Sequence, residues 1–126
     1  MTDKPRRSLM ILVAGPYRSG TGDDPVRIAA NVKGMTDMAL RLYRAGHLPV
    51  MGEWIALPLL EAAGSKQVGD AAFDEIFHPS AVRLLEHCDA CLRIGGPSEG
   101  ADHMLRTAQG FGLAIYHRFE EVPPAG

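Results

Sequence analysis

The stretch LMILVAGPYRSG, residues 9 to 20, decides the fold that this sequence predicts. Its first six residues are apolar without alternation, which is typical of a strand buried on both faces of a parallel sheet. Gly15 and Pro16 end this strand, and a polar, glycine-rich loop follows from Tyr17 to Asp23. We therefore expect a central strand of an α/β fold, with an open loop at its carboxyl end.

A helix and a second strand are expected directly after this loop. Asp24 is suited to the N-cap and Pro25 to the first helical position. The apolar residues that follow recur at spacings of three and four, which predicts one buried helical face: Ile28, Val32, Met35, Ala39 and Leu42. Gly46 is suited to end the helix in the left-handed conformation. The strand His47–Met51 should then lie parallel to the first, joined by a right-handed crossover.

The rest of the chain alternates between helical and strand patterns. We expect inner helical faces at Val82, Leu85 and Cys88, and at Ala101, Met104, Ala108 and Phe111. The expected elements are a short helix at 54–63, a loop at 64–71, a helix at 79–87 that can begin upstream of Pro79, a strand at 90–94, a helix at 99–109 capped by Ser98, and a strand at 113–116.

This alternation favours a doubly wound, flavodoxin-like or Rossmann-like parallel sheet. We expect four to five strands in the order 2-1-3-4, without placing a fifth strand. The 126 residues should form a single domain from 1 to 126, with loose tails at 1–7 and 123–126.

Composition excludes several classes of function. The net charge is -2, from 13 basic and 15 acidic side chains, so no attraction to a nucleic acid polymer or a membrane is expected. The polar, basic start lacks the apolar core of a signal peptide, which favours a cytoplasmic protein. Cys88 and Cys91 are expected to be buried thiols, since they span a helix end and a strand start rather than a redox loop. The histidines lack metal-ligand spacing, so no metal or cofactor is expected.

Two similar loops carry the functional signal. Gly15–Gly20 follows the first strand and Gly95–Gly100 follows the third, so the predicted strand order places them side by side where ligands bind such sheets. Glycine lets the backbone approach a ligand, and the helix that begins after Ser98 favours an anion. Ordinary strand-to-helix turns have a similar composition, which is the alternative. The expected ligand-binding residues here are Gly15, Pro16, Arg18, Ser19, Gly96, Ser98, Glu99 and Gly100.

Three further side chains are expected at the same edge of the sheet. Tyr17 is a candidate catalytic residue that can stack on a ligand or hydrogen-bond to it, although it can also simply pack in the loop. Glu53 and Trp54 follow the second strand. Glu53 is a candidate catalytic carboxylate, and Trp54 can stack on a base, although a tryptophan more often packs against its neighbours.

Two segments carry a resemblance to a known family. The first, Ile11–Tyr17, resembles the opening strand and loop of the nucleoside 2-deoxyribosyltransferase-like superfamily. The second resembles the other signature of that superfamily, and it consists of Cys88-Asp89-Ala90, a strand, and the residues from Pro97 to Ala101. The order and spacing of elements match over nearly the whole chain. The superfamily includes deoxynucleoside monophosphate N-glycosidases, and the resemblance implies a homodimer or higher homo-oligomer.

The resemblance also implies a chemistry. In the family a carboxylate attacks the anomeric carbon of a 2-deoxyribosyl group and the base leaves. By position, Tyr17 matches the loop tyrosine, while Ser98 and Gly100 match residues that hold the sugar or the phosphate. Asp89 matches an aspartate before the third strand.

The sequence departs from the family where the nucleophile is expected. The nucleophilic glutamate falls at Met104, and a thioether cannot replace it. Asp102 is a candidate, but it lies two residues away, about 200° around a helix. Glu53 and Glu99 are the other candidates. Where the family places an acidic residue upstream of Asp89, this chain has the stretch 78–81, His-Pro-Ser-Ala.

Three hypotheses follow. The first is an enzyme that acts on the N-glycosidic bond of a nucleoside or nucleotide, and a carboxylate near Tyr17 that faces the pocket would support it. The second is a nucleotide-binding module without catalysis, consistent with Met104. The third is an oligomeric scaffold, which a closed or filled switch point would support.

Overall fold

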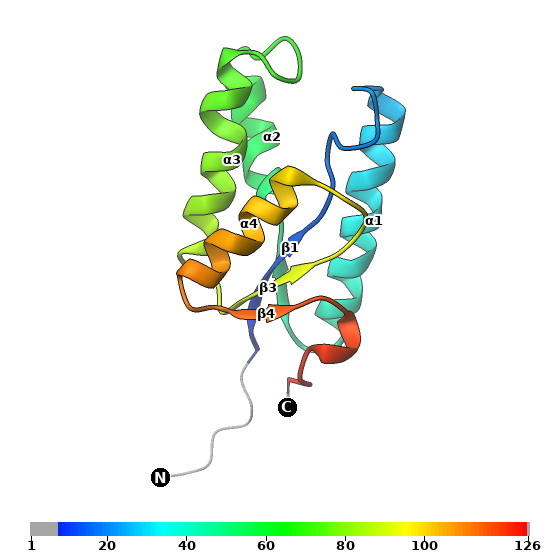
Figure 1. Cartoon of the computed structure of the whole chain (residues 1–126), viewed down its shortest axis with the longest axis vertical. Helices are drawn as coiled ribbons and strands as arrows, with labels where there is room; N and C mark the ends of the chain where they lie inside the picture. Colours follow the sequence, from blue (N-terminus) through cyan, green and yellow to red (C-terminus); the bar gives the residue numbers. More distant parts are fainter. Residues whose placement is uncertain (1–7, 126) are drawn as a thin grey trace.

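A four-stranded, all-parallel sheet forms the middle layer of the structure, in the order β2-β1-β3-β4 (Figure 1). The structure is a computed structural model that describes residues 8 to 125. The strand order confirms the expected flavodoxin-like winding. In chain order the elements are β1 (Met10–Ala14), α1 (Pro25–Arg44), β2 (Leu48–Val50), α2 (Gly52–Ala62), α3 (Ala71–Leu85), β3 (Ala90–Arg93), α4 (Glu99–Gly110), β4 (Ala114–Tyr116) and the 3₁₀ turn η1 (Phe119–Glu121).

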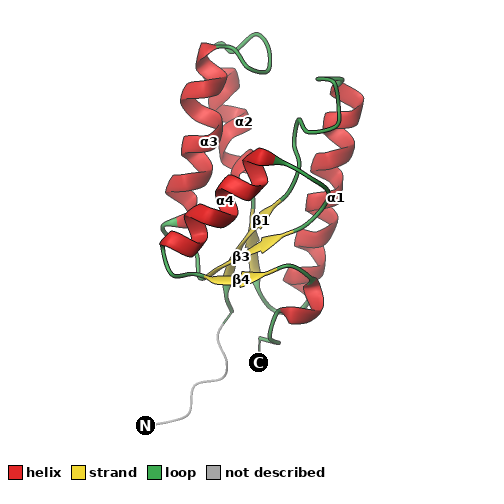
Figure 2. Cartoon of the chain, in the orientation of Figure 1, coloured by secondary structure: helices red, strands yellow, loops and turns green. Residues whose placement is uncertain are grey.

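The two faces of the sheet bury separate apolar clusters, because successive side chains of a strand point to opposite faces. Ile11 and Val13 of β1 pack toward α1, where Met35 and Leu42 are buried. Leu12 of β1 packs on the other face, in the cluster beneath α3 and α4. Figure 2 shows these helices on both sides of the sheet. The continuous apolar pattern of β1 is therefore explained by burial on both faces.

The start and end of α1 confirm the sequence prediction. The Asp24 carboxylate accepts a hydrogen bond from the backbone N–H of Val26, and Pro25 is the first helical residue. Gly46 follows the helix with a φ of +96°, a conformation that glycine adopts without a steric penalty. The short α1–β2 joint keeps β2 parallel to β1.

The start of α3 lies eight residues upstream of the helix expected from Pro79. Asp70 is its N-cap: the carboxylate accepts hydrogen bonds from the backbone N–H groups of Phe73, Lys66 and Gln67. These bonds lower the pKa of Asp70 to about 2. Pro79 therefore lies inside the helix, and the cap outweighed the usual role of proline as a helix boundary.

Three smaller expectations need correction or restriction. Phe111 is not on the inner face of α4, because it is the C-cap of that helix and 44% exposed. The segment 123–125 is not a loose tail, since the Nε2 of buried His47 donates to the carbonyl of Pro123 at 2.7 Å. The expected tail at 1–7 and Gly126 lie outside the described residues. Four strands pair within residues 8–125, so no fifth strand appears there.

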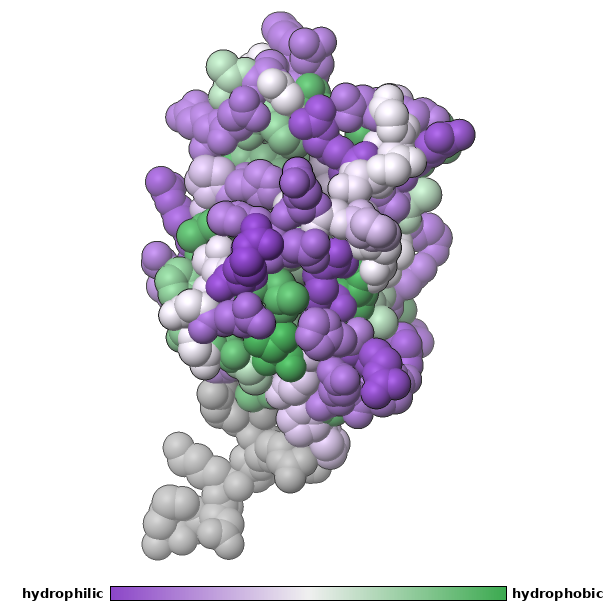
Figure 3. All heavy atoms as spheres, viewed as in Figure 1, coloured by the Kyte–Doolittle hydropathy of each residue, from purple (hydrophilic) through white to green (hydrophobic). Residues whose placement is uncertain are grey.

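The surface separates into polar and apolar regions. On the face shown in Figure 3, hydrophilic side chains cover most of the surface and hydrophobic ones gather in a smaller area. By contrast, α2 exposes four large apolar side chains: Trp54, Ile55, Leu57 and Leu59. None of the helices described is both long enough and apolar enough to cross a membrane.

Candidate functional site

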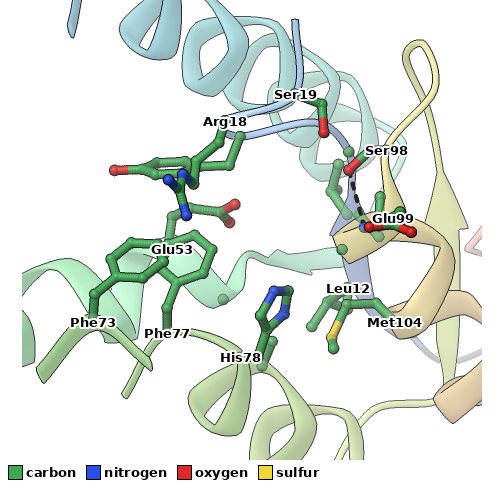
Figure 4. A pocket seen from close by; sticks show the side chains of 18 of the residues that line it. Leu12, Arg18, Ser19, Glu53, Phe73, Phe77, His78, Ser98, Glu99 and Met104 are labelled. Carbon is green, nitrogen blue, oxygen red and sulfur yellow. Dashed lines mark hydrogen bonds between the residues drawn. The ribbon is translucent and has the colours of Figure 1, made fainter. Parts of the chain in front are cut away.

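A cavity of about 590 Å³ opens at the carboxyl end of β1. Its walls are the loop after β1, the start of α2, one side of α3 and the start of α4 (Figure 4). This volume is within the range of small-molecule sites. Among the residues expected from the sequence, the cavity is lined by Gly15, Tyr17, Arg18, Ser19, Glu53, Ser98, Glu99 and Gly100.

The two glycine loops lie against each other, as the strand order predicts. Gly95 has a φ of +82°, and a Cβ atom at this position would lie 2.6 Å from Cδ of Pro16. Such a distance is well inside van der Waals contact, so only glycine fits here without a shift of the proline ring. Gly95 and Pro16 thereby fix the spacing between the two loops beside the cavity.

The loop after β1 is held by its own side chains. The guanidinium of Arg18 donates to both carboxylate oxygens of Asp23, at 3.0 and 3.1 Å. The side-chain amide of Asn31 on α1 donates to the carbonyl of Tyr17 at 3.0 Å. The forked face of Arg18 expected to bind a phosphate is therefore already engaged with a carboxylate.

The loop after β3 is held from outside the cavity. Arg93 donates to Asp102 at 3.1 Å and to the carbonyl of Gly96 at 2.9 Å, and its side chain is only 10% exposed. Ser98 is the expected N-cap of α4, since its hydroxyl accepts from the N–H of Ala101 at 3.2 Å. These contacts present the first turn of α4 to the cavity.

Glu53 is the most unusual charged group of the site. It is 8% exposed, and its carboxyl group points into the space between the aromatic rings and Ser98 (Figure 4). Burial raises the pKa of Glu53, an effect only partly offset by a hydrogen bond from its own backbone N–H. Burial also raises the pKa of the Tyr17 hydroxyl, and the nearby charge of Glu53 adds to this shift. A carboxyl group therefore faces the cavity near Tyr17.

An aromatic cluster forms the wall beside Glu53. The ring centroids of Tyr17 and Phe77 are 4.6 Å apart, as are those of Phe73 and Phe77. The guanidinium of Arg18 lies over the Phe73 ring at 5.5 Å, within the range of a cation–π interaction. This wall offers flat apolar surface on which a planar ring can stack.

His78 lies between this wall and the start of α4. Its Cε1 atom would be 2.8 Å from a Cβ on Gly100, so glycine leaves room for the imidazole. Burial lowers the pKa of His78, and so does the neighbouring His103, whereas Asp74 opposes this shift. His78 therefore favours its neutral form, and it points into the cavity from α3 (Figure 4).

Four of the expected site residues do not line the cavity. Asp102 pairs with Arg93, and its side chain is 51% exposed, because it lies on the side of α4 away from Met104. Met104 lines the cavity at 5% exposure, so the helix register leaves Asp102 outside. Trp54 is 43% exposed on α2. Pro16 and Gly96 shape the loops without lining the cavity.

The α3 side of the site was missed in the sequence. Phe73, Phe77 and His78 line the cavity together with Asp74. The spacing of Phe73 and Phe77 places them on one helical face, and Asp70 carries the N-cap signal. A helix predicted to start after the Asp70 cap would have included these residues, but the helix expected from the sequence starts at Pro79.

The two cysteines lie outside the cavity. Cys88 and Cys91 are free, buried thiols, and burial raises their pKa values to about 11 and about 12. Such thiols are poor nucleophiles near neutral pH. Within residues 8–125 the histidine, cysteine and carboxylate side chains form no group of three that could hold a metal ion.

Comparison of the chain with protein-family models and with curated proteins finds no match.

Proposed function

We propose that this protein acts on the N-glycosidic bond of a nucleoside or nucleotide bound in the cavity at the carboxyl end of β1. The observation that carries the proposal is Glu53, a buried carboxyl group that faces the cavity beside Tyr17. The resemblance to the nucleoside 2-deoxyribosyltransferase-like superfamily supports the same chemistry, which needs a carboxylate in the pocket.

In the proposed reaction, the base stacks on the wall formed by Tyr17, Phe73 and Phe77. Ionised Glu53 attacks the anomeric carbon, and the bond between this carbon and the base nitrogen breaks with its electron pair on the base. Water then hydrolyses the glycosyl ester, or a second base accepts the sugar. Glu53 thus takes the role that the family assigns to the residue at Met104.

The alternative is a binding module that lacks catalysis, and Met104 favours it. Its thioether lies in the cavity where the resemblance places the nucleophile. In that case the ligand would bind and remain intact. An open cavity of about 590 Å³ argues against the third hypothesis, a scaffold with a closed switch point.

The experiment is incubation with a panel of nucleosides and deoxynucleoside 5′-monophosphates, with free base followed by chromatography. We expect base release from at least one substrate, and a loss of about 10²-fold or more in Glu53→Gln, as for removal of a nucleophile. Glu61→Gln, an exposed change on the same helix, is the matched control and should behave as wild type.

Two further variants separate the candidate carboxylates. Asp102→Asn should retain activity, because Asp102 lies outside the cavity. Glu99→Gln tests the carboxylate at the start of α4. Release of base that survives Glu53→Gln would reject Glu53 as the nucleophile, and binding of a nucleoside without release across the panel would favour the binding module.

We also propose a homo-oligomer, as the resemblance implies. The four exposed apolar side chains of α2 support it, because a helix that is apolar on most sides is normally covered. Light scattering after size-exclusion chromatography should give a mass above one chain, and Trp54→Glu should lower it. A monomer at all concentrations would contradict the proposal.

A further inference from the structure

The charged side chains that line the cavity are mostly carboxylates. The lining includes one guanidinium, that of Arg18, and four carboxyl groups: Asp23, Glu53, Asp74 and Glu99. Arg18 is already bound through both oxygens of Asp23. Arg18 also attracts Asp74, and the lowered pKa of His78 favours its uncharged form, so Glu53 and Glu99 remain without a cationic partner among the described residues of the cavity wall.

Glu53 distinguishes this arrangement from an ordinary acidic surface. More than nine-tenths of its surface is buried, and no other described residue donates a hydrogen bond to its carboxyl group, which points into the cavity. A buried carboxyl group without a cationic partner is costly, and a positive ligand would relieve that cost. A phosphate would instead add negative charge to this cavity.

The aromatic wall already accommodates a positive charge. The Arg18 guanidinium lies 5.5 Å from the centroid of Phe73, and Phe77 stacks on Phe73 with a centroid distance of 4.6 Å. Ring faces combined with carboxylates are the usual means of binding a delocalised organic cation. In Figure 4 the Glu53 carboxyl group lies beside this wall, so both elements face the same space.

We propose that the preferred ligand of this cavity is a nucleoside whose base carries a positive charge, such as a pyridinium or N7-alkylated purine nucleoside, rather than a nucleoside phosphate. This inference rests on the proposed function and narrows its substrate class. The base ring lies against Phe77 and Tyr17, with its charge near Glu53 and Asp74.

A cationic base also simplifies the chemistry of the site. When Glu53 attacks the anomeric carbon, the electron pair of the breaking C–N bond neutralises the charged ring. The base therefore leaves as a neutral molecule without a proton donor, and water hydrolyses the ester on Glu53. The reaction therefore needs no proton from His78, whose lowered pKa favours its uncharged form.

The test uses matched probes that differ mainly in charge. N7-methylguanosine, guanosine and guanosine 5′-monophosphate are titrated into the full chain by calorimetry, and nicotinamide riboside is titrated beside nicotinic acid riboside. We expect each cationic nucleoside to bind at least roughly tenfold more tightly than its less positive partner, and the monophosphate most weakly. The preference should decrease with added salt, because partly exposed charges are screened.

Asp74→Asn and Glu53→Gln should each reduce this preference, whereas Glu61→Gln should leave it unchanged. Tighter binding of the monophosphate, or equal binding of guanosine and its N7-methyl derivative, would overturn the inference. Base release from neutral nucleosides would then show that the proposed function stands without it. If none of the nucleosides binds, both the inference and the proposed function are rejected.

Discussion

The two glycine-rich loops at the candidate site have similar composition but contribute different groups. The loop after β1 is long, and it contributes the side chains of Tyr17 and Arg18 to the cavity. The loop after β3 turns directly into α4, so it contributes mainly the start of that helix, with Ser98 as the cap. Similar residues thus have different roles, because the loop after β1 has five more residues before its helix than the loop after β3.

The loops also differ in how they are fixed. The loop after β1 contains the pair Arg18–Asp23, and the pair Arg93–Asp102 joins the elements on either side of the other loop, but the Arg18 side chain is 42% exposed and the Arg93 side chain only 10%. The first pair lines the cavity, and the second lies outside it. The first loop is consequently held by an exposed ion pair, and the second by the mostly buried side chain of Arg93.

The largest effect on stability is expected at the contact between the loops. Gly95→Ala should lower the free energy of unfolding by about 3 kcal/mol, from left-handed strain and a clash with Pro16. Urea unfolding measures the loss. Gly20→Ala, with positive φ but open space, should cost only the strain, and Gly96→Ala should be nearly neutral. Equal losses in Gly95→Ala and Gly20→Ala would show that the loops are not in contact.

The second effect compares the two arginines. Arg93→Ala should cost about 1–3 kcal/mol, because it removes bonds to Asp102 and Gly96 from a mostly buried side chain. Arg18→Ala should change stability little, since exposed ion pairs contribute little. Denaturation of both variants under one set of conditions gives the comparison. A larger loss of stability in Arg18→Ala than in Arg93→Ala would contradict this comparison of the two loops.

A smaller, pH-dependent effect is expected at Glu53, in the first turn of α2. Its folded-state pKa is raised above that of a glutamate in an unfolded chain, which is about 4.3. Between these values the folded state binds more protons, so stability decreases as the pH rises through this window. Glu53→Gln should remove this part of the pH dependence. Unfolding curves from pH 4 to pH 7 test it, and parallel profiles for both proteins would contradict the raised pKa.

The smallest effect on stability is expected at Gly100, where the second loop becomes α4. Gly100→Ala should leave stability nearly unchanged, because the side chain in its way, His78, can rotate and alanine favours a helix. The added methyl group would nevertheless narrow the cavity and weaken nucleoside binding. Gly110→Ala, at the far end of α4 with open space, is the control. Unchanged binding in Gly100→Ala would place the ligand away from this helix end.

Most of the fold could be predicted because its signals are local. The apolar run of β1, the cap at Asp24 and the cap at Ser98 each involve residues close together in the chain. The strand order then followed from general rules on parallel sheets. The site could be predicted only in part: the loops and Glu53 were expected because they follow strands, whereas Phe77 and His78 come from a helix whose start was misplaced.

The sequence by itself therefore determined the layers of this protein, the order of its strands and the edge of the sheet at which a ligand site should lie. Only the tertiary structure decided which side chains meet there. The helical spacing already predicted that Met104 points inward, but only the tertiary structure paired Asp102 with Arg93 and so excluded it from the cavity. It also paired Arg18 with Asp23 and left Glu53 buried at the aromatic wall, because such contacts depend on how separate elements pack.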